Sequence, residues 1–141
     1  MRALSLDLGT KTIGLAVTDE ASIAAHPLPR LSRTATTSDV SAIQTRVAEL
    51  DITDVIVGMP YELSGRIGHR ARQVQQFIHA LRASLAPTVQ IHEQDERFTT
   101  AEAERVLLSA DVSRARRREV IDSQAAVLIL QAWLDARSRS K

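Results

Sequence analysis

Short apolar stretches in the first quarter of the chain predict strands. Residues 3–8 (ALSLDL) alternate weakly between apolar and polar positions, and residues 13–18 (IGLAVT) form a second stretch of strand length. One glycine and several polar residues separate them, as in a hairpin turn. A short third strand is expected at residues 28–33. Pro27 and Pro29 suit an edge of the sheet or an irregular entry to the strand, not a central strand, because proline cannot donate a hydrogen bond to a central ladder.

In the middle of the chain the spacing of apolar residues becomes helical. Ser38 or Asp39 is expected to cap a helix that ends near Leu50. A second helix is expected over residues 67–86, and Pro87 closes it. Two short apolar stretches predict further strands, at residues 54–58 and 88–92. Two more helices are expected in the last third of the chain, at about residues 99–110 and 117–137.

The predicted order of elements, β-β-β-α-β-α-β-α-α, indicates an α/β fold. It predicts a mixed five-stranded sheet, with three antiparallel strands followed by two parallel ones, flanked by helices. We find no linker, repeat or low-complexity stretch, so residues 1–141 are expected to form a single domain. The arginine-rich link at residues 114–118 comes nearest to a mobile loop.

Composition narrows the class of protein. The absence of cysteine excludes a disulfide framework and a cysteine-ligated zinc site. No stretch approaches the roughly 20 apolar residues of a membrane span, so a soluble cytoplasmic protein with no membrane partner is expected. The net charge of +1 predicts no partner by itself. Clustered arginines, however, could hold a phosphate backbone in one place while separate acidic positions hold metal in another.

Three acidic positions are unusual for their surroundings. Asp7 lies in an otherwise apolar strand, Asp95 and Glu96 follow the strand at residues 88–92, and Asp122 lies on the apolar stripe of the last helix. An outward-facing strand residue, a solvated loop and a favourable helix start would also explain them, and spacing alone leaves both interpretations open. If the carboxylates converge, their oxygen ligands suit Mg²⁺ or Mn²⁺.

Four blocks of sequence share one pattern along nearly the whole chain: Asp7-Leu8-Gly9-Thr10-Lys11 with Ile13-Gly14 and Asp19; Val57-Gly58-Met59-Pro60 with Gly65; Asp95-Glu96-Arg97-Phe98-Thr99-Thr100; and Ile121-Asp122-Ser123-Gln124-Ala125-Ala126 with Leu130-Gln131. In order and spacing these blocks resemble the YqgF/RuvX family. Its members are described as pre-16S rRNA nucleases and are relatives of the Holliday junction resolvase RuvC.

The resemblance implies a ribonuclease H-like fold and a metal-dependent nuclease. It implies that Asp7, Glu96 and Asp122 are the catalytic, metal-binding carboxylates for Mg²⁺ or Mn²⁺, with Asp95 as a possible helper. The chain departs from the family pattern at Thr12, where a basic residue is usual, and at Tyr61-Glu62, where Leu-Asn is frequent. Both departures make the local charge less positive and put phosphate contacts near those loops in doubt.

Nucleic acid is the expected partner, either precursor rRNA or branched DNA. Lys11 and Arg97 are expected to contact phosphate or to neutralise the carboxylates, and Tyr61 to stack on a base or sugar. Arg116 and Arg117 belong to the basic cluster beside the last helix and are expected to bind phosphate.

The expected activity is hydrolysis of phosphodiester bonds in structured nucleic acid, with 5′-end processing of precursor 16S rRNA favoured. Resolution of Holliday junctions is the alternative, and it requires a homodimer because two strands must be cut. A non-catalytic nucleic-acid-binding module is a third possibility, although acidic groups facing phosphate would not help a pure binder. The Asp-Leu-Gly-Thr segment also resembles the first phosphate loop of actin-like and sugar-kinase ATPases, but those proteins need two such domains.

Overall fold

The computed structural model describes the backbone of residues 1–96 and 114–139, and the side chains of residues 1–96 and 124–139. In the described part of the chain the elements are β1 (Ala3–Leu8), β2 (Thr12–Thr18), β3 (Ala25–Ser32), α1 (Thr36–Glu49), β4 (Asp54–Met59), α2 (His69–Ser84), β5 (Gln90–Asp95) and α4 (Arg114–Arg139). The helix expected over residues 99–110 lies outside the described residues.

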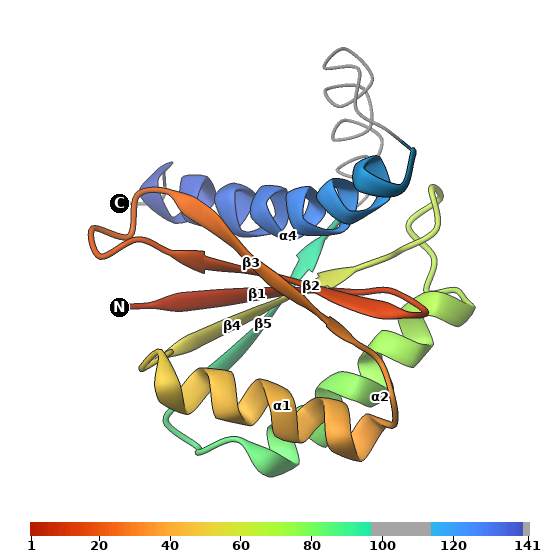
Figure 1. The fold of residues 1–141 in the computed structure, drawn as a ribbon, viewed down its shortest axis with the longest axis horizontal. Coiled ribbons are helices and arrows are strands. Elements are labelled where there is room, and N and C mark those ends of the chain that lie inside the picture. Colours follow the sequence, from red (N-terminus) through yellow and green to blue (C-terminus); the bar gives the residue numbers. More distant parts are fainter. Residues whose placement is uncertain (97–113, 140–141) are drawn as a thin grey trace.

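The five strands form one sheet in the order β3-β2-β1-β4-β5. The pairs β1–β2 and β2–β3 are antiparallel, whereas β1–β4 and β4–β5 are parallel. This confirms the predicted α/β class and mixed sheet. Helix α4 covers one face, and α1 and α2 cover the other (Figure 1). The carboxyl ends of β1, β4 and β5 therefore meet at one edge of the sheet, where ligands of open α/β sheets bind.

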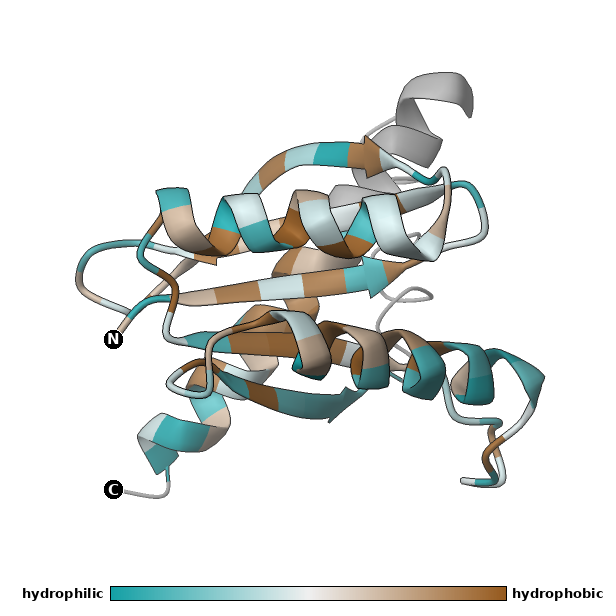
Figure 2. Cartoon of the chain, turned by 90° about the horizontal axis from the view of Figure 1, so that it is seen from below, coloured by the Kyte–Doolittle hydropathy of each residue, from teal (hydrophilic) through white to brown (hydrophobic). Residues whose placement is uncertain are grey.

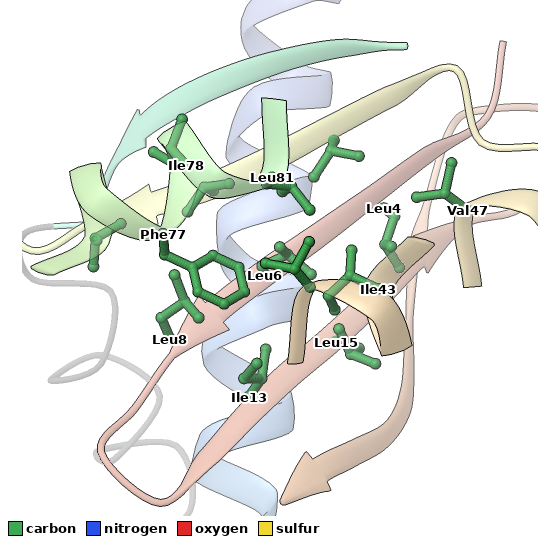
Figure 3. Packing of buried hydrophobic residues seen from close by; sticks show 14 of the residues in the cluster. Leu4, Leu6, Leu8, Ile13, Leu15, Ile43, Val47, Phe77, Ile78 and Leu81 are labelled. Carbon is green, nitrogen blue, oxygen red and sulfur yellow. The ribbon is translucent and has the colours of Figure 1, made fainter. Parts of the chain in front are cut away.

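Apolar side chains form a core on each face of the sheet. The larger core lies between the sheet and helices α1 and α2, and Figure 3 shows strand residues such as Leu6 and Leu15 meeting Ile43 and Phe77 from the helices. The smaller core lies under α4 and contains Ile129. In Figure 2 the central strands are mostly hydrophobic, while α1 and α2 carry both hydrophilic and hydrophobic residues. Alternation along each central strand supplies both cores.

The edge strand agrees with the prediction from its prolines. β3 is an outermost strand of the sheet and contains Pro27, whose partner on β2 is Ala16. It begins at Ala25, three residues earlier than expected. The register between β2 and β3 shifts between Ile13 and Leu15, which is the kind of irregularity that an edge position tolerates.

Three boundaries predicted from local signals were wrong. Helix α1 begins at Thr36, and Asp39 lies buried in its first turn instead of capping it. Strand β5 begins and ends later than expected, because the turn after α2 extends to Val89, whose N–H donates to Ala86. The expected loop at residues 114–118 is part of α4.

Candidate active site

Asp7 faces the side of the sheet that α4 covers. Its neighbours Leu6 and Leu8 belong to the larger core, so alternation turns Asp7 to the opposite face. Ser5, two residues earlier on the same face, donates from Oγ to the backbone carbonyl of Ala126 in α4 at 2.7 Å. The half-buried Asp7 carboxyl therefore lies under α4, at the carboxyl end of β1.

Glu96 reaches the same place from β5. Its backbone N–H donates to the carbonyl of Met59 at 3.2 Å, which fixes the chain as it leaves the strand. Asp95 is the last residue of β5, not a loop residue as predicted, and only Glu96 follows the strand. The side chain of Glu96 then lies close enough to Asp7 for a hydrogen bond between the two carboxyl groups.

Gly58 on β4 makes room for the Glu96 carboxyl. A Cβ atom added to Gly58 would lie 2.7 Å from Oε2 of Glu96 and 2.5 Å from Cδ1 of Ile129. Real Cβ atoms do not approach other atoms this closely, since carbon contacts are favourable near 3.5–4.0 Å. The glycine of the Val57–Pro60 block thus allows helix α4 and Glu96 to pack against the strand beside Asp7.

The surroundings of Glu96 disfavour its negatively charged form. Burial, followed by the charge of Asp7 and the hydrogen bond with it, raises the pKa of Glu96 to about 8, and Asp95 contributes in the same direction. The positive charge of Arg70 opposes this rise in pKa. At neutral pH the pair formed by Asp7 and Glu96 therefore retains a proton.

The described carboxylates suit a divalent cation, although they do not complete a metal site. Two converging carboxyl groups that share a proton at neutral pH offer oxygen donors, and Mg²⁺ or Mn²⁺ would stabilise their ionised forms. Within residues whose side chains are described, no group of three metal-ligating residues is present. The third expected ligand, Asp122, belongs to α4, but its side chain lies outside the described ones.

The structure describes the side chains of two of the expected substrate-binding residues, Lys11 and Tyr61. Lys11 is exposed in the hairpin between β1 and β2, near the carboxyl end of β1. Tyr61 is half-buried and packs against the larger core, so part of its ring is already covered. Arg97 lies outside the described residues, and so do the side chains of Arg116 and Arg117.

Sequence reasoning missed Arg70 as part of this site. Arg70 lies in the first turn of α2, and its Nη2 donates to the backbone carbonyl of Leu8 at 3.0 Å. Its charge acts on Glu96 across the same edge of the sheet. The available signal was an arginine at the start of the helix that follows β4, at the edge where the carboxylates were expected.

In the described residues, no helix is both long and apolar enough to span a membrane.

Comparison with known proteins identifies relatives over nearly the full chain. The family model described as "RuvX: Holliday junction resolvase" matches residues 1–136. A protein of Myxococcus xanthus (strain DK1622) is 48% identical over 136 residues, which cover 96% of this chain and 89% of the relative. A protein of Desulforudis audaxviator (strain MP104C) is 42% identical over 141 residues, which cover 100% and 99% of the two chains. Both relatives bear the name "Putative pre-16S rRNA nuclease".

Solved structures of resolvases share the fold. The RuvC of T. thermophilus in complex with a Holliday junction substrate superposes with a TM-score of 0.64 at 16% identity, covering 99% of this chain and 97% of that one. The fowlpox virus Holliday junction resolvase gives a TM-score of 0.60 at 12% identity, with 97% and 99% covered. These likenesses confirm the ribonuclease H-like fold expected from the sequence blocks. The family match over residues 1–136, together with the relative that is 48% identical, shows that the chain belongs to the RuvX family.

Proposed function

We propose that residues 1–141 form one nuclease domain that uses a divalent metal ion, Mg²⁺ or Mn²⁺, to hydrolyse phosphodiester bonds in structured nucleic acid. The observation that carries this proposal is the convergence of Asp7, on β1, and Glu96, directly after β5, on the edge of the sheet where ligands of such folds bind. Two carboxyl groups so close that burial and mutual repulsion raise a pKa to about 8 are unfavourable in a purely structural role.

Asp7, Glu96 and Asp122 are the residues that would hold the metal. When bound, the metal would supply an activated water and stabilise the leaving oxygen of the phosphodiester. Glu96 must give up its proton to serve as a ligand. The ionised Glu96 then repels the carboxylate of Asp7, and the bound metal ion would offset that repulsion. Gly58 keeps the Glu96 carboxyl beside Asp7, and Arg70 moderates the negative charge of the pair.

The path of α4 supports the inclusion of Asp122. Ala126 of α4 accepts the hydrogen bond from Ser5, which lies two residues before Asp7 on the same strand face. Asp122 precedes Ala126 by four residues, or about 6 Å along the helix axis, which is similar to the spacing of Ser5 and Asp7 along β1. Because α4 and β1 run in opposite directions (Figure 1), Asp122 lies on the helix towards the same end of the sheet as Asp7.

The proposed physiological substrate is the 5′ end of precursor 16S rRNA, in ribosome biogenesis in the cytoplasm. Relatives above 40% identity carry the name of a pre-16S rRNA nuclease, which favours this substrate. Holliday junction DNA is the second candidate, because the family description names it. The two differ in what they require. Trimming an RNA end needs one active site, whereas symmetric cleavage of a junction needs two cuts and hence a homodimer.

The test presents the purified protein, with Mn²⁺, to a labelled precursor rRNA end and to a labelled four-way junction, while its mass in solution is measured. Cleavage of the rRNA end by a monomer supports the proposal, and symmetric junction cutting by a dimer would replace rRNA with DNA as the substrate. The variants Asp7→Asn, Glu96→Gln and Asp122→Asn should each abolish cleavage. Glu93→Gln, an exposed position on β5, is the matched control and should cut normally.

Metal binding is measured separately by calorimetric titration of Mn²⁺. The wild type should bind the ion and release a proton near pH 7, because Glu96 is protonated before binding. A wild-type protein that binds no Mn²⁺ and cuts neither substrate would contradict the proposed nuclease and favour a nucleic-acid-binding module without catalysis.

A further inference from the structure

A polar cavity lies on the other side of the β1 end from the carboxylates. It has a volume of about 400 Å³ and is lined by residues of the β1–β2 hairpin, the segment before α1, and α2. Its polar lining consists of Thr10, Arg33, Thr36, Arg70, Gln73 and Gln76, and we call it the arginine pocket. Leu8 and Phe77, which lie side by side in Figure 3, line it from the core. The volume is within the range of ligand sites, about 300–1,000 Å³.

Arg33 is held in the pocket by fixed partners. Its Nε lies 3.3 Å from Oδ2 of the buried Asp39, and its Nη1 donates to the carbonyl of Gly9 at 3.1 Å. The guanidinium carbon is 5.6 Å from the ring centroid of Phe77. These contacts fix the plane of the guanidinium but engage only part of its five N–H donors. A preorganised guanidinium of this kind binds an anion at low entropic cost.

Arg70, Gln73 and Gln76 present a second set of donors from α2. They are spaced three residues apart and so share one face of the helix. Arg70 is anchored by its bond from Nη2 to the carbonyl of Leu8, and this bond uses only one of the five N–H donors of its guanidinium. Among the described residues, no carboxylate lines the pocket; Asp39, which pairs with Arg33, is not part of the lining.

The arginine pocket adjoins the candidate active site through β1. Leu8 lines the pocket, and the preceding residue, Asp7, belongs to the carboxyl pair on the opposite face. Arg70 contributes to both places, since it lines the pocket and its charge also reaches Glu96. A nucleic acid strand that crosses this edge of the sheet would meet metal-binding carboxylates on one face and arginines on the other.

We propose that the arginine pocket binds a phosphate group of the substrate strand, next to the phosphodiester that is cut. Guanidinium groups recognise phosphate oxygens through paired N–H bonds, and the threonine hydroxyls and glutamine amides add neutral donors. This inference rests on the proposed nuclease function and adds a substrate subsite to it. Its role is to position the strand, because Arg33 and Arg70 lie outside the carboxyl pair.

The test measures binding of a fluorescent oligonucleotide by anisotropy in EDTA, over a series of salt concentrations, so that no cleavage occurs. Arg70→Gln should weaken binding about tenfold near 0.1 M salt and reduce the salt slope by about one phosphate contact. Arg82→Gln removes the same charge from the far, exposed end of α2 and should leave both quantities unchanged.

A second pair of variants leaves the arginines in place. Gln73→Glu adds a negative charge to the pocket and should weaken binding about as much, whereas Gln75→Glu adds it to the same helix outside the pocket and should not. All four positions are exposed, so thermal unfolding should show intact folding. Unchanged affinity and salt slope in both Arg70→Gln and Gln73→Glu would overturn the proposal.

Two further measurements separate the possible outcomes. If a mononucleotide such as AMP binds in an Arg70-dependent manner while oligonucleotide binding does not depend on Arg70, the pocket serves a free nucleotide and the assignment to the substrate strand is wrong. If the wild type fails to cut any substrate with Mn²⁺ but its oligonucleotide binding still depends on Arg70 and Gln73, the nuclease function fails while the phosphate subsite stands.

Discussion

Replacement of Gly58 by alanine should damage the carboxylate pair more than it damages the fold. The φ angle of Gly58 is not positive, so alanine meets no backbone strain there. The added Cβ, however, would lie 2.5 Å from Cδ1 of Ile129 and 2.7 Å from Oε2 of Glu96. Each neighbour must move by about 1 Å to restore an ordinary contact.

The expected effect on stability is modest. Overpacking of a core costs about 1–3 kcal/mol, and the lower flexibility of alanine in the unfolded chain returns about 0.5–1 kcal/mol. Gly58→Ala should therefore lower the free energy of unfolding by about 0.5–2 kcal/mol. The affinity for Mn²⁺ should fall about tenfold or more, because displacement of a carboxylate ligand by 1 Å is large on the scale of metal coordination.

A second substitution separates the two contacts. Ile129→Val removes Cδ1, the atom that the new Cβ would meet first, and by itself costs about 0.5–1.5 kcal/mol. In the double variant the stability losses should be less than additive, by about 1 kcal/mol, while the loss of Mn²⁺ affinity should persist because Glu96 is still displaced. Urea unfolding and calorimetric titration of Mn²⁺ measure the two quantities. Full Mn²⁺ affinity in Gly58→Ala, or its recovery in the double variant, would refute the assignment of Gly58 to the carboxylate site.

Three other predictions test different parts of the molecule. In metal-free protein, the folded-state pKa of Glu96 of about 8 lies above its ordinary value of 4.5, so the folded state binds the extra proton and stability falls as pH rises between these values. At pH 9, but not at pH 4, the free energy of unfolding of Glu96→Gln should therefore exceed that of the wild type by about 2 kcal/mol, after allowance for solvent screening. Urea unfolding measures the difference, with Glu93→Gln as the control. A difference that does not grow with pH contradicts the reasoning. Gln131→Leu should lower the free energy of unfolding by about 1–2 kcal/mol, because it removes the side-chain bonds that tie α4 to the start of β3, and a two-state denaturation curve measures the loss. Exchange of Arg116 and Arg117 for glutamine should flatten the salt dependence of nucleic-acid binding, and an unchanged slope would assign them to a solvated surface.

The sheet could be predicted from sequence because its strands carry patterns that few other structures produce. β4 is buried at every position, which matches its continuous apolar run. β3 is an edge strand, which is one of the two places that its prolines allow. The first residues of the helices were harder to predict. Asp39 has the residue type of a cap, but its carboxylate instead accepts from the backbone N–H of Thr34 and contacts Arg33, and nothing in local spacing distinguishes these uses.

Only part of the candidate site could be predicted from the sequence. Asp7 stood out because an ionised carboxylate in an apolar strand is costly to bury. Its convergence with Glu96 followed from the family resemblance, since the two are far apart in the chain. Gln131 belonged to a recognised block, yet its anchoring of the β3 start to α4 is visible only in the structure. The same is true of Gly58, because a sequence does not show which side chains lie opposite a missing Cβ.

The sequence could not predict the arginine pocket, and the geometric reason for this also bears on function. Asp7 and Leu8 are consecutive on β1 and therefore point to opposite faces of the sheet, so one strand end contributes to an acidic site under α4 and to a basic pocket beside α2. Arg70 reaches both, by its bond to the Leu8 carbonyl and its charge on Glu96. Arg70→Gln should therefore weaken the binding of nucleic acid measured in the absence of metal, and it should also raise the pKa of Glu96 further. Gln73 lies farther along α2, so Gln73→Glu should act mainly on the binding of nucleic acid. A shift of the pH dependence of Mn²⁺ binding in Arg70→Gln that is much smaller in Gln73→Glu would show that the two sites meet at this arginine.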